Sequence, residues 1–380
     1  MGETLRIALF VHHQLVTGTG AAGSTLSLAD ALRARGHVVD VFGLELAGSG
    51  ESIARQIRFP FVAAQRVRRA LRSHEYDIID ASTGDLWLLT RAEIARSRTV
   101  VLTRSHGLEP LGVAARRAGV KRGELTLRRR YRLYHGGWRL HEVRRTLRIA
   151  DAVLVLNKYE RDYVTALRGD QTSTVMTAPL MGPGYAAAPD VTAVARVLVT
   201  GGTQWRKGGH DNGAVIAALL ERNAELVVTW LGADEASVKE WVTERHRPRV
   251  HVVSSATGND IASLLAEHRV VVHLSRFEGW GMLVVEALSH GCIVVATDVG
   301  VVGEVIASSG FVVPLGDRDA AVGAVDAALR APDWAERAQR AATAAARFEP
   351  SRVVTLLEEN YFEARRAKES RVAAAAKGVS

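Results

Sequence analysis

Short, β-branched apolar runs alternate with longer segments of helical apolar spacing along most of the 380 residues. Continuous apolar runs are typical of buried parallel strands, and apolar positions three or four residues apart are typical of amphipathic helices. In the first half, strands are predicted at Leu5–Val11, Val38–Phe42, Asp77–Asp80, Thr99–Thr103 and Ala152–Leu156. In the second half they are predicted at Val197–Thr200, Glu225–Trp230, Val250–Val253, Val270–Leu274 and Ile293–Thr297. The alternation predicts α/β architecture with two parallel sheets and helices on both faces.

A stretch rich in proline and glycine, Thr177 to Pro189, interrupts this pattern near the middle of the chain. We therefore predict a first Rossmann-like domain at 1–180, a linker at 181–191 and a second Rossmann-like domain at 192–348. The remaining residues, 349–380, are expected to form a last helix followed by a frayed tail from Lys368. Ligands of such sheets bind beyond the carboxyl ends of the strands.

The strongest candidate site follows the predicted strand Val270–Leu274. Gly279 and Gly281 allow the backbone to approach a ligand, and a helix from Met282 to His290 ends at Gly291, a plausible C′ glycine. The start of that helix offers free N–H groups to an anion. Glu278 lies in the loop and Glu286 in the second helical turn, where its side chain leans back toward the same mouth. Two carboxylates beside an anion site suit a ligand that carries both hydroxyls and phosphate.

The run Glu278-Gly-Trp-Gly281, followed by Glu286, resembles the signature of the retaining family-4 glycosyltransferases of the GT-B fold. Gly291 to Gly300, and then Glu304, continue the likeness. The resemblance implies two Rossmann-like domains facing each other across a cleft, with the last helix crossing back to the first domain. It also implies transfer of a sugar from a nucleoside-diphosphate sugar, such as a UDP- or GDP-sugar, to an acceptor hydroxyl. Such enzymes retain the anomeric configuration and require neither a catalytic metal nor another cofactor.

The same resemblance implies roles for individual residues. Glu286 should hold the ribose hydroxyls and Glu278 the hydroxyls of the donor sugar. The diphosphate should meet the backbone amides of Met282 and Leu283 and the cations Arg206 and Lys207. Family members usually carry an arginine at the end of the strand before this lysine, where this chain has Gly201-Gly202. Arg206 is the candidate for the missing charge.

The run Gly18-Thr-Gly20-Ala-Ala-Gly23, with Asp40 further along, matches a dinucleotide-binding fingerprint. His12 to Thr17 separate it from the preceding strand, which argues against a nicotinamide site. The family resemblance implies instead a glycine-rich loop that reaches the donor diphosphate, with Gly20 and Gly23 as its members.

Histidines after the first-domain strands supply further candidates. His106 resembles a family histidine placed near the transferred sugar, where a neutral imidazole bonds to hydroxyls. His12 and His13 are weaker candidates for the acceptor side, and Glu304 is a weak donor contact. Asp317-Arg-Asp319 imitates a metal motif of another glycosyltransferase fold, but its position before an alanine-rich segment indicates a helix N-cap. No other cluster has metal-ligand spacing.

Composition and charge leave the partners open. The single cysteine, Cys292, excludes an internal disulfide framework, and no apolar run reaches the roughly 18 residues of a spanning helix. We expect a cytoplasmic protein, with a peripheral position at the inner membrane face as an option. The net charge is +8, and Arg116 to Arg148 is the most basic segment. A solvated helix face with its aromatics turned to the core is favoured there over an anionic membrane, an acidic acceptor or RNA.

Two alternatives to a glycosyltransferase remain. A nucleotide-sugar epimerase or a sugar phosphorylase uses the same architecture, and the epimerase would convert donor without any acceptor. A non-catalytic RNA- or membrane-binding module is supported only by the basic segment. Since both glutamates and Lys207 are present, we expect a nucleotide-sugar donor and no nucleic-acid partner.

Overall fold

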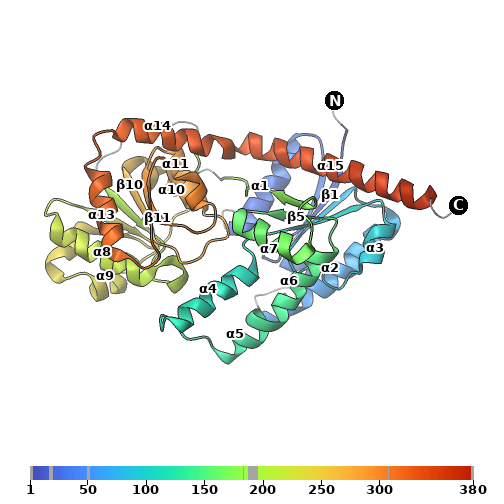
Figure 1. Cartoon of the computed structure of the whole chain (residues 1–380), viewed down its shortest axis with the longest axis horizontal. Helices are drawn as coiled ribbons and strands as arrows, with labels where there is room; N and C mark the ends of the chain where they lie inside the picture. The colour runs from blue at the N-terminus through green and yellow to red at the C-terminus, as the bar shows by residue number, and fades with distance from the viewer. Residues whose placement is uncertain are drawn as a thin grey trace. The chain divides into compact units, whose positions relative to one another are not determined.

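The computed structural model describes residues 3–16, 20–48, 52–182, 184–186, 196–306 and 308–377. It divides into two compact units, each built on its own parallel sheet (Figure 1). The first unit contains Met1–Val120, Thr126–Leu180 and Pro350–Ser380; the second contains Lys121–Leu125 and Met181–Glu349.

The first sheet has the strand order β2-β1-β3-β4-β5-β6, and every pairing is parallel. Its strands are β1 (Arg6–Phe10), β2 (Val38–Phe42), β3 (Ile78–Ser82), β4 (Val100–Arg104), β5 (Ala152–Val155) and β6 (Thr174–Met176). Its helices are α1 (Gly20–Ala34), α2 (Ile53–Ser73), α3 (Arg91–Arg96), α4 (Glu109–Lys121), α5 (Arg129–Leu133), α6 (Arg139–Ile149), α7 (Lys158–Arg168) and α15 (Pro350–Lys377). The turns η1 (Leu44–Ala47) and η2 (Tyr134–Trp138) complete the unit.

Side chains of β1 alternate between two cores, one on each face of this sheet. Ala8 and Phe10 pack with α2, whereas Ile7 and Leu9 pack with α1 and α15. Because the pairing is parallel, β1, β3 and β4 bring their carboxyl ends to the same edge, and they are neighbours in the sheet. That edge holds the polar residues described below.

The last helix, α15, completes the core of the first unit. Tyr361 is fully buried, and its hydroxyl donates to Oδ2 of Asp80 at 2.6 Å. Lys368 is also buried, with Nζ 2.9 Å from both carboxylate oxygens of Asp151. The expectation of a frayed tail from Lys368 is therefore wrong as far as Lys377, because this buried ion pair anchors the helix.

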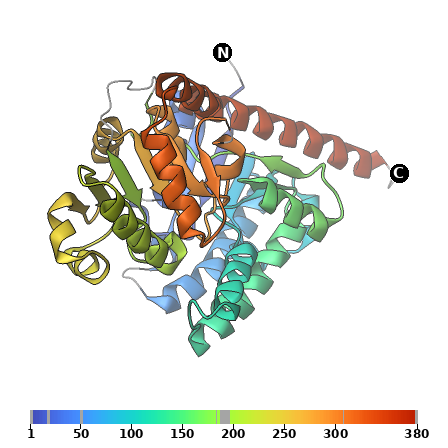
Figure 2. The same cartoon turned by 60° about the vertical axis from the view of Figure 1, so that its left-hand side comes forward.

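The second sheet has the order β12-β11-β10-β7-β8-β9 and is also entirely parallel. Its strands are β7 (Val197–Thr200), β8 (Val228–Leu231), β9 (Val250–Val253), β10 (Val270–His273), β11 (Ile293–Thr297) and β12 (Phe311–Val313). Its helices are α8 (Gly209–Arg222), α9 (Glu235–Trp241), α10 (Asn259–Glu267), α11 (Met282–Ser289), α12 (Val302–Val305), α13 (Arg318–Leu329) and α14 (Trp334–Ala345). Three 3-10 turns join them: η3 (Trp205–Lys207), η4 (Glu244–Arg249) and η5 (Ala346–Phe348). Figure 2 views both sheets with helices packed on either side.

The predicted α/β architecture with two Rossmann-like units is confirmed. All ten predicted strands are present; the largest shift in a boundary is at β8, predicted from Glu225 and observed from Val228. The sequence did not predict β6 and β12, which are three-residue strands at the sheet edges. Asp317 is the N-cap of α13, as predicted, and its side chain accepts from the N–H of Ala320 at 2.9 Å.

Candidate functional site

Helix α11, which follows β10, has a glycine with positive φ at each end. Gly281, with φ of 109°, precedes α11, and Gly291, with φ of 77°, follows its cap residue His290. The predicted helix and its C′ glycine are thus confirmed. Among the described residues, the N–H groups of Met282 and Leu283 have no hydrogen-bond acceptor. These donors are available to an anionic ligand.

Glu278 is the centre of a charged cluster in this loop. Its Oε1 lies 2.6 Å from Lys207 Nζ and accepts from Ser275 Oγ at 2.7 Å, and its Oε2 lies 3.2 Å from Arg206 Nη1. His273 Nε2 is 3.4 Å from Oε1. Burial alone would raise the pKa of Glu278, but His273, Lys207 and Arg206 hold that pKa well below its usual range. Glu278 is therefore ionised throughout the physiological range, and the cations beside it leave the cluster with net positive charge.

Tight backbone packing requires a glycine on each side of η3, and one of them, Gly202, stands where the family usually has an arginine. Gly202 has φ of 58°, and a Cβ there would lie 1.9 Å from the carbonyl oxygen of Gly232. Gly208 has φ of 74°, and its Cβ would lie 2.1 Å from the carbonyl oxygen of Leu274. No larger side chain fits at either position. Both cations instead come from η3, between these glycines.

Glu286 lies in very different surroundings. Its carboxylate is buried and has no hydrogen-bond partner among the described residues, and this burial raises its pKa to about 7. Gly184 covers it: a Cβ on that glycine would lie 2.9 Å from Oε1 of Glu286. His290 bonds to the carbonyl oxygen of Gly184 at 3.1 Å, which fixes this cover. Glu286 is thus an unpaired carboxyl under a glycine, ready to accept from ligand hydroxyls.

The loop after β11 supports the site. The N–H of Val301 donates to the carbonyl oxygen of Trp280 at 2.8 Å, and Gly300 approaches the same carbonyl too closely for a Cβ. Glu304 lies in α12, directly after this loop. Arg276, in the Glu278 loop, is held by Asp211 of α8 at 2.6 Å. These contacts fix the loop on both sides.

The first unit has its own pocket at the carboxyl ends of β1, β3 and β4, with a volume of about 310 Å³. It is lined by His12, His13, Leu44, Gln56, Ser82, Thr83, His106, Gly107, Glu109, Tyr134, His135 and Arg139. All three histidines predicted for this unit meet here, although they follow two different strands.

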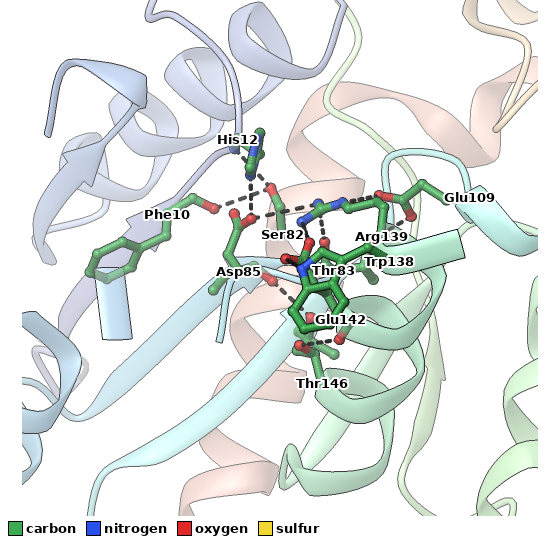
Figure 3. Close-up of polar contacts among 12 residues, drawn as sticks. Phe10, His12, Ser82, Thr83, Asp85, Glu109, Trp138, Arg139, Glu142 and Thr146 are labelled. Carbon is green, nitrogen blue, oxygen red and sulfur yellow. Dashed lines mark hydrogen bonds and ion pairs between the residues drawn. The ribbon is translucent and has the colours of Figure 1, made fainter. Parts of the chain in front are cut away.

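A buried ionic network forms the floor of this pocket (Figure 3). His12 Nδ1 lies 2.6 Å from Oδ1 of Asp85, which is fully buried. Arg139 contacts Thr83 O at 2.7 Å, Glu142 at 3.1 Å and Glu109 at 3.2 Å, and lies 3.6 Å from Asp85. Sequence reasoning missed Asp85 and Arg139, because neither belongs to a recognisable motif.

His106 and His13 are neutral over the physiological range. Burial, and then the charge of Arg104, lower the pKa of His106 to about 3. Burial and the neighbouring His12 lower the pKa of His13. Among the described residues, neither ring has a hydrogen-bond partner. Both imidazoles can therefore donate and accept toward a ligand.

Some predicted features differ from the structure. Gly20 begins α1 and Gly23 lies buried in its first turn, so these glycines do not form the expected loop; Gly18 lies outside the described residues. In the basic segment Trp138 does not turn to the core, because it is 50% exposed and packs edge-on against Trp87, whereas Tyr131 and Tyr134 are half-buried. The arginines of Arg128 to Arg130 are exposed, as predicted.

Within the described ranges, no three His, Cys, Asp or Glu side chains gather as metal ligands would. No helix in those ranges is long and apolar enough to cross a membrane.

Two family models match the two halves of the chain. Glycosyltransferase family 4 matches residues 18–177, and glycosyl transferases group 1 matches residues 195–347. With two parallel six-stranded sheets, these matches define a glycosyltransferase of the GT-B class. The chain belongs to the family-4-like glycosyltransferases, as its Glu278 to Glu286 signature predicted.

Individual relatives are more distant. Glycogen synthase of Mycobacterium tuberculosis is 27% identical over 229 residues, which cover 55% of this chain and 54% of the relative. The chain thus spans about half the length of the curated relatives it matches.

Solved structures share the fold over nearly the whole chain. Sucrose-phosphate synthase of Thermosynechococcus elongatus has a TM-score of 0.72 at 18% identity and covers 96% of this chain and 100% of its own. Anabaena HepE, solved with UDP and glucose, has a TM-score of 0.64 at 19% identity, covering 94% and 100%. The lipopolysaccharide glycosyltransferase WaaG has a TM-score of 0.65 at 16% identity, covering 89% and 95%.

Proposed function

We propose that this protein transfers a sugar from a nucleoside-diphosphate sugar to an acceptor hydroxyl, with retention and without a catalytic metal. The observation that carries the proposal is the buried Glu278 paired with both Lys207 and Arg206, in the loop that leads into α11. The unpaired N–H groups of Met282 and Leu283 begin the same helix. The loop therefore offers cations and backbone donors to phosphate, and a carboxylate to sugar hydroxyls.

The two cations have a role in catalysis as well as in binding. Arg206 and Lys207 are partly exposed, so each can keep Glu278 on one side and bind phosphate on the other. Charge accumulates on the departing diphosphate in the transition state, so these cations stabilise that state more than the bound donor. One charge-assisted bond contributes about 1.5–3 kcal/mol, or about one to two decades of rate.

Retention is proposed through a front-face mechanism. The acceptor oxygen bonds to the anomeric carbon while the bond to the diphosphate breaks, and the departing phosphate oxygen takes the acceptor proton. The surroundings of Glu278 support this choice over a covalent intermediate: bonds from Lys207, Arg206 and Ser275 make its carboxylate a weaker nucleophile, and Oε2, which accepts only from Arg206 in the described part of the chain, keeps room for a sugar hydroxyl. Glu278 and His106 then bind the donor sugar, and Glu286 binds the ribose hydroxyls.

A donor screen tests the function. Thermal stabilisation by UDP-, GDP- and ADP-sugars should identify the donor, and UDP-sugars come first because the related HepE structure holds UDP and glucose. Release of nucleoside diphosphate, unaffected by EDTA, and NMR of the product anomer then test the reaction. Conversion of the donor sugar without nucleotide release would indicate an epimerase instead. A requirement for inorganic phosphate would indicate a sugar phosphorylase.

Contact with an anionic membrane is a second candidate. Leu133 is 76% exposed and Trp138 is 50% exposed, close in sequence to the exposed arginines Arg128–Arg130. Apolar and basic side chains together favour an anionic bilayer surface. Sedimentation with phosphatidylserine vesicles at low salt tests it; a supernatant that keeps all the protein would exclude it.

A further inference from the structure

The pocket of the first unit exposes carbon atoms as well as polar atoms. Of its twelve lining residues, only Leu44 is aliphatic, and most of the others carry hydrogen-bonding side chains. Its volume of about 310 Å³ is near the lower end for ligand pockets, roughly 300–1,000 Å³. These properties suit one small ring that carries hydroxyls at its edge and C–H groups on its faces.

The guanidinium of Arg139, in the lining of this pocket, is already bonded to other protein groups. Among the residues that the structure describes, Arg139 is the only arginine or lysine that lines the pocket. Its guanidinium is bonded to Glu109, Glu142 and the carbonyl oxygen of Thr83, and Asp85 lies beside it. Taking Arg139 from these partners would leave buried carboxylates unpaired, at a cost of several kcal/mol. The described lining therefore offers no free arginine or lysine to a phosphate or carboxylate of the ligand.

The histidines of this pocket differ from Arg139, because they keep ring nitrogens that can bond to a ligand. Asp85 accepts from Nδ1 of His12, and this contact leaves Nε2 of that ring unused. His13 and His106 are neutral and have no protein partner in the described part of the chain. The Gln56 side chain is likewise unpartnered there. A neutral imidazole and an amide each combine donor and acceptor, as a hydroxyl does.

We propose that this pocket binds the acceptor, and that the acceptor presents a neutral, hydroxyl-rich ring the size of one monosaccharide or cyclitol. His12, His13 and Gln56 bind its hydroxyls, whereas His106 of the same pocket keeps its proposed role at the donor sugar and Arg139 keeps its bonds to Thr83, Glu109 and Glu142. This assignment rests on the proposed transferase function and adds the acceptor class to it. It excludes sugar phosphates as preferred acceptors.

The test compares acceptors in pairs, with the donor found in the screen. Glucose, mannose, galactose, N-acetylglucosamine and myo-inositol are each assayed beside their monophosphates. Nucleoside diphosphate release and product mass are the readouts. At least one neutral ring should accelerate release, with a kcat/KM about tenfold or more above that of its monophosphate, a factor equal to about 1.4 kcal/mol. A phosphorylated ring preferred throughout would overturn the proposal.

Variants locate the binding to this pocket. His12→Gln and Gln56→Ala should each raise the acceptor KM about tenfold, and change the donor KM far less. His141→Gln is the matched control, because His141 is an exposed histidine of the same unit that does not line the pocket. Since Gln56 is unpartnered, its variant remains informative even if His12→Gln fails to fold.

Failure of the acceptor assignment can be told from failure of the function. If nucleotide release proceeds normally and neither variant changes the acceptor KM, the acceptor assignment alone is refuted. Absence of nucleotide release with every donor would sink the transferase function instead. In that case calorimetry of myo-inositol and glucose with wild-type protein still decides whether the pocket binds a neutral ring.

Discussion

Lys207 Nζ lies 2.6 Å from Oε1 of Glu278, in the loop that precedes α11. The two residues are far apart in sequence, and the contact joins the turn after β7 to the turn after β10, which are neighbouring strands. The Lys207 ammonium is thus fixed by the same carboxylate that is proposed to hold the donor sugar. A diphosphate bound here would share the cation with Glu278, so the pair couples recognition of the two ends of the donor.

Replacing Lys207 by alanine should lower kcat by about ten- to a hundredfold, because one charge-assisted contact to the departing diphosphate is lost. Steady-state kinetics with the donor found in the screen measures this. Lys239→Ala removes an exposed lysine of the same unit and should behave as wild type. Equal turnover in the Lys207 and Lys239 variants would contradict the clamp.

Glu286→Gln should change how stability depends on pH. Burial raises the pKa of Glu286 to about 7 from an ordinary value near 4.5, so the folded state holds a proton that the unfolded state releases. Wild-type stability should therefore fall as the pH rises from about 4.5 to 7, by up to about 3 kcal/mol. Glutamine carries no such penalty.

The difference in Tm between Glu286→Gln and wild type should consequently be small near pH 4.5, grow up to pH 7 and then stay level. Thermal denaturation across this range checks it, and a constant difference would refute the buried, unpaired carboxyl.

Glu286→Ala should also weaken donor binding in calorimetry. Unchanged donor affinity would remove its proposed role at the ribose.

Lys368→Ala should destabilise the protein by about 3–5 kcal/mol, because it leaves the buried Asp151 without its main counter-charge. Chemical denaturation measures the change. Arg366→Ala, an exposed position on the same helix, is the control and should change stability little. If both variants unfold at the wild-type midpoint, the C-terminal end of α15 does not stabilise the fold.

Gly202→Ala should destabilise the second unit by about 1–3 kcal/mol, since its Cβ meets the carbonyl oxygen of Gly232 and its φ is positive. Gly323→Ala is a contrasting variant in α13, where a Cβ meets nothing within 4 Å. Because glycine is unfavourable inside a helix, that variant should gain about 0.5–1 kcal/mol. Melting curves of the two should move in opposite directions; a rise in Tm for Gly202→Ala would disprove the close approach.

Local signals made the second-unit site predictable. The run Val270–Leu274, the glycines 279 and 281 and the helix from Met282 lie within one short stretch, so periodicity and backbone freedom point to the same place. The same logic failed at β6 and β12, because a strand of three residues at a sheet edge is too short to show a period. The glycines at 20 and 23 were misleading, since their φ preferences do not prevent a helix from starting there.

The features that the sequence did not predict depend on contacts between residues that are far apart in the chain. Asp85 lies 73 residues after His12 in an unremarkable turn, and only the neighbouring positions of β1 and β3 bring the two together. Arg139 looked like one more charge of the basic segment, yet it is buried beneath the pocket. Gly184 over Glu286 could not be predicted, because nothing local in the sequence links that glycine to α11.

The position of α15 also has a consequence for biosynthesis. Val353, Leu357 and Tyr361 share a core with Leu5, Ile7 and Leu9, so strand β1 of the first unit packs against a helix that is translated only after the second unit. Domains generally fold in order as they leave the ribosome. Here we expect the reverse: the second unit can fold on the nascent chain, whereas the first waits for α15.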